Sequence, residues 1–158
     1  MKLAILLSLL LLACGRATVG RDPRISAYIE NFETYSGVQF NGTVEIVKLN
    51  IDTHTIDGMC SLQRSRLTKE LEVNSRTSRI QLDSDTYNKA IKAGDSLLLE
   101  QILMHEFLHC TKVKDHDPAM TQSKSNYLMP KSVMYPYSFG NTAAYKNNRE
   151  YYFKELLK

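Results

Sequence analysis

Two histidines and one glutamate stand at a spacing that could bind a metal ion and put it to use. The stretch LMHEFLHC at residues 103–110 contains the pattern His105-Glu106-x-x-His109. Residues four apart lie on one face of a helix, so the two histidines would point the same way. Neutral imidazoles at this spacing suit zinc, which binds them at about 2.0–2.1 Å. Glu106 lies beside them, where it could take a proton from a zinc-bound water as general base.

The residues around this motif predict a buried helix. Gly94-Asp95-Ser96 is a typical helix start, with the aspartate or the serine as the cap. The alternative is a helix that carries two histidines without a function. A buried helix makes polar side chains costly unless they have partners, and a metal ion supplies partners. Apolar residues crowd almost all round this helix: Leu97, Leu98, Leu99, Ile102, Leu103, Met104, Phe107 and Leu108.

Length and charge limit the kind of protein. The chain has 158 residues, which is enough for one domain with a sizeable hydrophobic core and too few for two domains of ordinary size. Charges of both signs are mixed along it, and the net charge is +3. Because no basic run is dense, we expect no nucleic-acid partner.

The N-terminus has the features of an export signal. Lys2 is followed by an apolar stretch to Ala13, which is too short to span a bilayer and ends on a small residue. The sequence LLAC at residues 11–14 resembles the bacterial lipobox, in which the cysteine becomes the acylated first residue of a mature lipoprotein. The alternative is an ordinary signal peptide that is cleaved near a cysteine.

The lipobox resemblance implies a division of the chain and a location. Residues 1–13 would be the signal peptide, residues 14–21 a tether and residues 22–158 the folded domain. A lipid on Cys14 would anchor the protein without a transmembrane helix. In lipoproteins, glycine at the second mature position, here Gly15, is not a retention signal for the inner membrane. We therefore expect the bacterial cell envelope, at the outer membrane in a Gram-negative host, or an extracellular location.

Two cysteines remain besides Cys14 after removal of the signal peptide. In an exported protein such a pair, here Cys60 and Cys110, indicates a disulfide. The bridge would tie the metal-binding helix to the strands before it. The alternative is two buried free thiols. Cys110 is a poor metal ligand, because adjacent helix residues point about 100° apart and Cys110 directly follows His109.

The remaining residues predict an α+β domain. Each end of the first helix carries a capping signal, since Asp22-Pro23 precedes it and Gly37 follows it. The predicted elements, in order, are a helix from Asp22 to Gly37, a strand within 38–49 broken at Asn41-Gly42, one or two strands within 59–71, a short strand at 79–83, a lead-in at 85–94, the metal-binding helix, a polar irregular stretch at 111–131, a turn at 132–137, and one amphipathic helix from Asn141 or Thr142 to Leu157.

The zinc motif and a turn downstream of it resemble the metzincin metalloproteases. The sequence SVMYP at residues 132–136 is similar to the matrixin form of the Met-turn, which lies beneath the metal in that family. The resemblance is specific over residues 95–137 and extends in element order over residues 22–157. It implies a twisted mixed β-sheet above a cleft, an N-terminal helix, a central zinc helix, and a small subdomain with the Met-turn and a C-terminal helix. Met134 would be the hydrophobic floor under the metal and not a ligand.

The third metal ligand has two candidates. Metzincins usually place glycine three residues after the second histidine and the third ligand three further on, where this chain has Lys112 and Asp115. With one extra residue in the turn, His116 takes that role, and we favour it because imidazole is a common neutral ligand of catalytic zinc. The longer turn should not need a residue with positive φ. Asp115 or Asp117 would then accept the free ring N–H of a ligand histidine.

Together these features predict a zinc-dependent endopeptidase, a hydrolase of the metzincin type held on the envelope as a lipoprotein. Three protein ligands leave one zinc position for a water, whose pKa the metal lowers to about 7. Glu106 would deprotonate that water during its attack on a peptide carbonyl and pass the proton to the leaving amine. We expect a monomer with a protein or peptide substrate. The alternatives are a zinc-containing binding protein or adhesin without proteolysis, and a metal-dependent hydrolase of a non-protein substrate.

Overall fold

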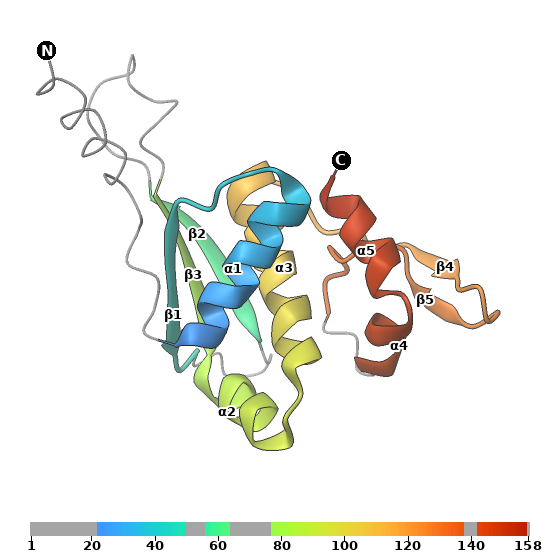
Figure 1. The fold of residues 1–158 in the computed structure, drawn as a ribbon, viewed down its shortest axis with the longest axis horizontal. Helices are drawn as coiled ribbons and strands as arrows, with labels where there is room; N and C mark the ends of the chain where they lie inside the picture. Colours follow the sequence, from blue (N-terminus) through green and yellow to red (C-terminus); the bar gives the residue numbers. More distant parts are fainter. Residues whose placement is uncertain (1–21, 50–55, 64–76, 138–141, 158) are drawn as a thin grey trace, which may run out of the picture.

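The chain is a small α+β protein with a twisted sheet and several helices (Figure 1). The computed structural model describes residues 22–49, 56–63, 77–137 and 142–157. The elements are α1 (Pro23–Ser36), β1 (Gly42–Val47), β2 (Gly58–Gln63), β3 (Thr77–Asp83), α2 (Ser84–Ala93), α3 (Ser96–Lys112), β4 (Met120–Gln122), β5 (Leu128–Pro130), α4 (Thr142–Asn147) and α5 (Arg149–Leu156).

The predicted first helix is confirmed together with both of its caps. The Asp22 side chain accepts a hydrogen bond from the Arg24 backbone N–H at 2.9 Å, and Pro23 stands in the first turn. At the other end Gly37 adopts φ +66°, the left-handed conformation that glycine reaches at low cost. The buried side of α1 is formed by Ile25, Tyr28, Ile29 and Phe32.

Three strands form the sheet in the order β1-β3-β2. β1 runs parallel to β3, whereas β2 runs antiparallel to β3. The register places Val44, Ile80 and Cys60 side by side, on the side of the sheet that packs against the helices. β2 is therefore an edge strand, and no other described strand pairs with its second edge.

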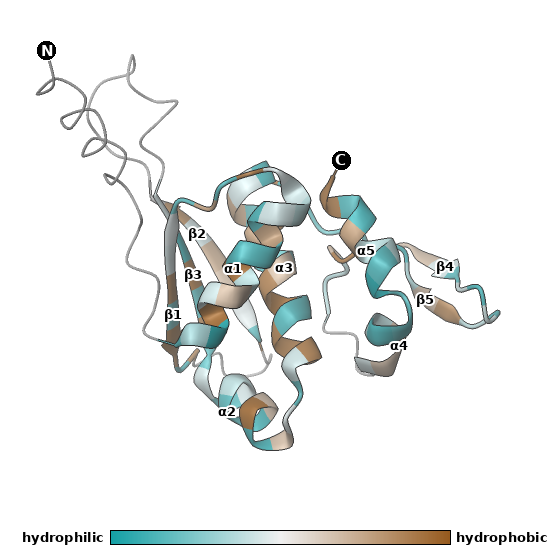
Figure 2. Cartoon of the chain, viewed as in Figure 1, coloured by the Kyte–Doolittle hydropathy of each residue, from teal (hydrophilic) through white to brown (hydrophobic). Residues whose placement is uncertain are grey.

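α3 is the central element, as its apolar composition predicts. It packs against α1, α2, β2, β3 and α4, and lies between the sheet and the C-terminal helices (Figure 1). Phe107 is fully buried, and its ring centroid lies 4.9 Å from that of Phe32 in α1 and 4.9 Å from that of Phe40. Figure 2 shows the apolar bands of α1 and α3 together with the apolar strands beside them. The Asp95 side chain caps α3 by accepting from the Leu98 N–H at 3.1 Å.

Three parts of the predicted element order are wrong. The lead-in at 85–94 is a helix, α2, which Asp83 caps at its start and Gly94 at its end. The stretch expected to be irregular contains the β4–β5 hairpin. The last helix is two helices, because the chain breaks at Asn148, where φ is −122°. The first predicted strand is also shorter than expected, since β1 begins only at Gly42.

Some predictions concern residues outside the described part of the chain. They are the signal peptide, the tether with Cys14, the cap at Asn141 and the second half of the 59–71 segment. None of the helices in the described ranges has the length and apolar character of a membrane span.

Candidate metal centre

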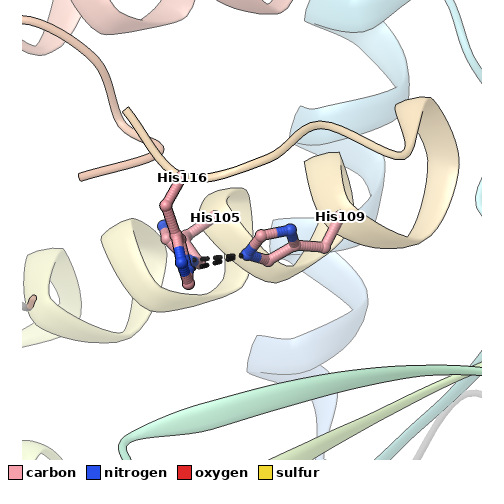
Figure 3. Close-up of side chains that lie close together, drawn as sticks. All are labelled: His105, His109 and His116. Carbon is pink, nitrogen blue, oxygen red and sulfur yellow. Dashed lines mark hydrogen bonds between the residues drawn. The ribbon is translucent and has the colours of Figure 1, made fainter. Parts of the chain in front are cut away.

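Three histidine side chains converge on one point beside α3 (Figure 3). The Nε2 atoms of His105 and His109 lie 3.0 Å apart. His116, from the chain that leaves α3, places its Nε2 atom 3.2 Å from that of His105 and 3.1 Å from that of His109. Three ring nitrogens thus form a nearly equilateral triangle.

The hydrogen bonds of Nδ1 define the tautomers of His105 and His109. His105 Nδ1 lies 2.9 Å from the Val133 carbonyl oxygen, and His109 Nδ1 lies 2.6 Å from the Lys114 carbonyl oxygen. A carbonyl oxygen only accepts, so each Nδ1 must donate its proton. In the neutral rings, Nε2 of both residues is then an acceptor. Two acceptors 3.0 Å apart repel each other, and a cation beside them removes that repulsion.

The environment of His105 and His109 favours the neutral form of their rings, which is the state that binds metal. Burial is the largest of the effects that lower the pKa of His105 to about 4; the hydrogen bond to Val133 opposes it, and the nearby His109 and His116 add to it. Burial likewise lowers the pKa of His109, and its hydrogen bond to the Lys114 carbonyl opposes this.

Of the two candidates for the third position, His116 joins the cluster. Its Nε2 atom belongs to the group of three nitrogens, whereas Asp115 does not belong to it. The Asp115 side chain is exposed at the rim of the same cavity. The extra residue in the turn therefore places His116, which is also exposed, beside the histidine pair.

The turn between His109 and His116 differs from expectation in two ways. Val113 adopts φ 51°, so a left-handed residue is needed after all, and here a β-branched one provides it. Its N–H donates to the Leu108 carbonyl and ends α3. The carboxylates expected to support the ligand histidines are not the acceptors for His105 and His109, because backbone carbonyls of Val133 and Lys114 serve instead. The Asp117 carboxylate accepts from the Ala119 N–H.

Glu106 lies one residue along α3 and faces the same cavity as the histidines. Its side chain is 5% exposed, and its burial raises the pKa to about 7, while a hydrogen bond from the Cys60 backbone N–H lowers it. The Oε2 atom is buried and has no hydrogen-bond partner among the described residues. A buried carboxylate oxygen without a partner is costly, so it indicates a group held for a ligand or a reaction.

The turn predicted at residues 132–137 lies next to this cluster. The Tyr135 N–H donates to the Ser132 carbonyl at 3.2 Å, and the Met134 side chain is buried. The Val133 carbonyl within the turn is the group that orients His105. Glu155 in α5 holds the turn from behind, since its two carboxylate oxygens accept from the Ser132 hydroxyl and, at 3.0 Å, from the Val133 N–H.

The cluster opens into a cavity of about 970 Å³. It is lined by the edge strand β2 with the residues just before it, by residues of α3 and the chain that follows it, and by residues 135–137. The exposed apolar side chains of Met59, Leu62, Val113 and Tyr137 line it. Exposed apolar groups around a polar centre are typical of a binding site.

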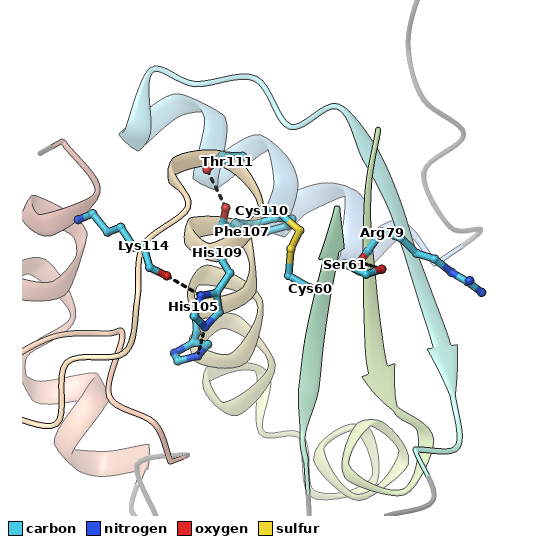
Figure 4. The surroundings of a disulfide bond; sticks show 9 residues. All are labelled: Cys60, Ser61, Arg79, His105, Phe107, His109, Cys110, Thr111 and Lys114. Carbon is cyan, nitrogen blue, oxygen red and sulfur yellow. Dashed lines mark hydrogen bonds between the residues drawn. A yellow bond between two sulfur atoms is a disulfide. The ribbon is translucent and has the colours of Figure 1, made fainter. Parts of the chain in front are cut away.

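The predicted disulfide between Cys60 and Cys110 is present, with the Cα atoms 5.7 Å apart. It links β2 to the last turns of α3, directly beside the histidines (Figure 4). The sequence therefore pointed to the histidines, the glutamate and this bridge. Gly58, Glu155 and the two carbonyl acceptors were missed. Only Gly58 carried a usable signal, since glycine in a strand often marks close approach of another element.

Comparisons of this chain with protein-family models, with curated proteins and with solved structures found no match. The assignment of a function therefore depends on the chemistry of the site and on the sequence motifs.

Proposed function

We propose that this protein is a zinc-dependent endopeptidase, with His105, His109 and His116 as the metal ligands and Glu106 as the general base. The observation that carries the proposal is the convergence of three Nε2 atoms within 3.0–3.2 Å of one another beside a buried carboxylate. A histidine cluster that only bound a structural metal would not need a general base such as the Glu106 carboxylate beside it.

The donor set fits zinc. Tetrahedral zinc with nitrogen ligands at 2.0–2.1 Å separates these nitrogens by about 3.3–3.4 Å. The observed separations of 3.0–3.2 Å are only slightly shorter. Three neutral imidazoles leave a fourth position, which is the arrangement of catalytic rather than structural zinc sites.

Zinc, when bound, acts as a Lewis acid that makes water more acidic and polarises a carbonyl. Glu106 contributes the proton transfers: Oε2, which has no partner among the described residues, accepts a proton from the attacking water and returns it to the leaving amine. A pKa raised by burial suits this role, because a base of higher pKa holds the proton more firmly until the amine departs.

A peptide is the substrate class that the surroundings favour. β2 borders the cavity and has one edge without a described partner strand, so an extended peptide could pair with its free backbone groups. The apolar side chains of Met59 and Leu62 on this strand, and of Tyr137 in the lining of the same cavity, would contact the side chains of such a peptide.

The same proposal includes a metzincin-like arrangement. Its support is the order of helix, sheet, α3 and turn, together with the buried Met134 in the turn that orients His105. Met134 would pack beneath the metal as part of a hydrophobic floor. From the lipobox resemblance, we further propose that the protein is a lipoprotein of the bacterial envelope, acylated at Cys14.

A substitution at the proposed base tests this function. Glu106→Gln should lower the rate of peptide hydrolysis by about 10²–10⁴-fold, the usual contribution of a general base, while one zinc ion per chain remains bound. The assay uses a peptide library or casein, with metal content measured on the same samples. A chelator should abolish hydrolysis by the wild-type protein, and added zinc should restore it.

Two results would contradict the proposal. Equal hydrolysis by Glu106→Gln and wild type would remove Glu106 from the reaction. A wild-type protein that binds zinc and cleaves no peptide in the library would instead favour a binding protein, or a hydrolase of another substrate class.

A further inference from the structure

Cys60 contacts α3 at two points on one face of the helix. Glu106 and Cys110 are four residues apart in α3, so their side chains leave the helix on the same side. The backbone N–H of Cys60 lies within reach of the Glu106 carboxylate. The Cys60 sulfur atom is bonded to that of Cys110 (Figure 4). β2 is thus linked covalently to α3 one helical turn from the place where it touches the proposed base.

Gly58, two residues earlier in the same strand, also faces Glu106. A Cβ atom at this position would lie 3.0 Å from Glu106 Cγ, 3.1 Å from Glu106 Oε1 and 2.9 Å from Ile102 Cγ2. These separations are shorter than ordinary van der Waals contact. The glycine is therefore needed for space, because any larger residue would press on the glutamate side chain.

The two contacts together restrict a side chain that would otherwise move. Glutamate has three rotatable bonds, and ordering them costs conformational entropy that neighbouring groups must offset. Cys60 provides a hydrogen bond for the carboxylate, and Gly58 allows the strand to pack directly against the side chain. Oε2, without a described partner, then remains for a proton transfer.

We propose that Gly58 and Cys60 are positioning residues for Glu106, and that the Cys60–Cys110 disulfide keeps β2 at the distance from α3 that this requires. The inference rests on the proposed function of Glu106 as general base. Neither residue needs to touch the substrate to act in this way.

The kinetic test compares two substitutions in the same strand. Gly58→Ala should lower kcat for peptide hydrolysis by about 10–100-fold, since a misplacement near 1 Å can cost about 10² in rate. KM and zinc affinity should stay within about twofold, because the variant leaves the histidines and the edge of β2 in place. The control is Ser61→Ala, which removes a hydrogen bond to the Arg79 carbonyl but has no contact with Glu106, and it should keep kcat.

A second measurement needs no substrate. In the ¹⁵N-labelled zinc protein, Glu106→Ala should speed hydrogen exchange of the Cys60 amide by about tenfold or more, because the acceptor of this N–H is lost. The amide of Ser61, the next residue, should change by less than about twofold. This comparison stays informative if Gly58→Ala does not fold.

The outcomes separate the two proposals. If wild type cleaves peptides and Gly58→Ala has the same kcat as Ser61→Ala, the positioning role is wrong and the endopeptidase proposal stands. If the Cys60 and Ser61 amides respond equally to Glu106→Ala, the positioning contact is also wrong. If wild type cleaves no peptide, the proposed function fails, and the exchange measurement alone decides whether Cys60 holds Glu106.

Discussion

At the scale of single residues, the chain offers Asp115 and His116 side by side, and only one of them reaches the histidine pair. Side chains of adjacent residues point in different directions, so the turn decides which one faces inward. Here the imidazole of His116 joins the other two histidines and the Asp115 carboxylate does not, although both residues are exposed. The zinc site would then have three neutral ligands and keep a net charge of +2.

Substitution of each residue in turn tests this assignment. His116→Ala should weaken zinc binding strongly, because two imidazoles alone hold the metal poorly, whereas Asp115→Ala should cost no more than about tenfold. Competition with a chromogenic chelator measures both affinities. Loss of zinc in Asp115→Ala with retention in His116→Ala would reverse the roles of the two residues.

Val113 is a strained residue in the same turn. A left-handed conformation costs a residue with a Cβ atom roughly 1–2 kcal/mol, and Val113 adopts φ 51° while its side chain is 62% exposed. Val113→Gly should therefore raise the free energy of unfolding by about 0.5–1 kcal/mol, after allowance for the greater freedom of glycine in the unfolded chain. Urea denaturation of the zinc-free protein measures it.

A matched substitution separates relief of strain from loss of the side chain. Val113→Ala keeps the Cβ atom and should bring no gain. If alanine stabilises the protein as much as glycine does, the backbone conformation is not the source of the effect.

At the scale of elements, α5 reaches the metal centre through two steps. Glu155 accepts from the Ser132 hydroxyl and the Val133 N–H, and the Val133 carbonyl in turn accepts from His105 Nδ1. The C-terminal helix thereby takes part in orienting His105, a proposed metal ligand that lies 50 residues earlier in the chain.

Glu155→Gln tests this connection. Gln has only one accepting oxygen where the carboxylate has two, so the Ser132 hydroxyl must lose its bond or turn to accept from the Gln NH2 group, and both bonds lose the strengthening effect of the negative charge. We expect zinc affinity to fall by about tenfold, the lower end of the range for partners behind a ligand. Glu150→Gln in the same helix removes an exposed ion pair with Lys154 and should leave zinc affinity unchanged. Equal affinities of the two variants would contradict the connection.

Helices and strands could be predicted from the sequence where capping residues and a long apolar pattern mark them clearly. α1 and α3 carry an aspartate cap before an apolar pattern, and both were predicted. α2 was missed because it is short and stands directly before α3, and β4 and β5 have three residues each, too few for an alternating pattern. The break before α5 has no side-chain cap to mark it.

In the site, the histidines and the glutamate could be predicted because a helix has a fixed period. The acceptors of the ring N–H groups could not, since every residue has a carbonyl and only the tertiary structure selects Val133 and Lys114. The choice between Asp115 and His116 likewise depends on the path of a turn that no sequence pattern determines.

At the scale of the whole molecule, the proposed lipid anchor on Cys14 would hold the candidate metal centre at a membrane surface. Cys14 lies outside the described residues, and Asp22, the cap of α1, follows eight residues later. Cys14→Ser in the native host should release the protein from membranes or leave it unprocessed, because the lipid is the only anchor that the sequence suggests. Cell fractionation and incorporation of labelled fatty acid measure this. A variant found in the membrane fraction with the same processed N-terminus would rule out acylation at Cys14.

The bonds that orient His105 and His109 have a thermodynamic consequence. They end on two separate segments, the turn held by α5 and the loop after α3, so the histidine cluster forms only when both are folded. On the proposed function, zinc binds the folded chain and not the unfolded one, and it adds RT ln(1 + [Zn]/Kd) to the folding free energy. Outside the cell, where no cytoplasmic pool buffers the metal, the supply of zinc would then govern how long each molecule lasts as well as whether it is active.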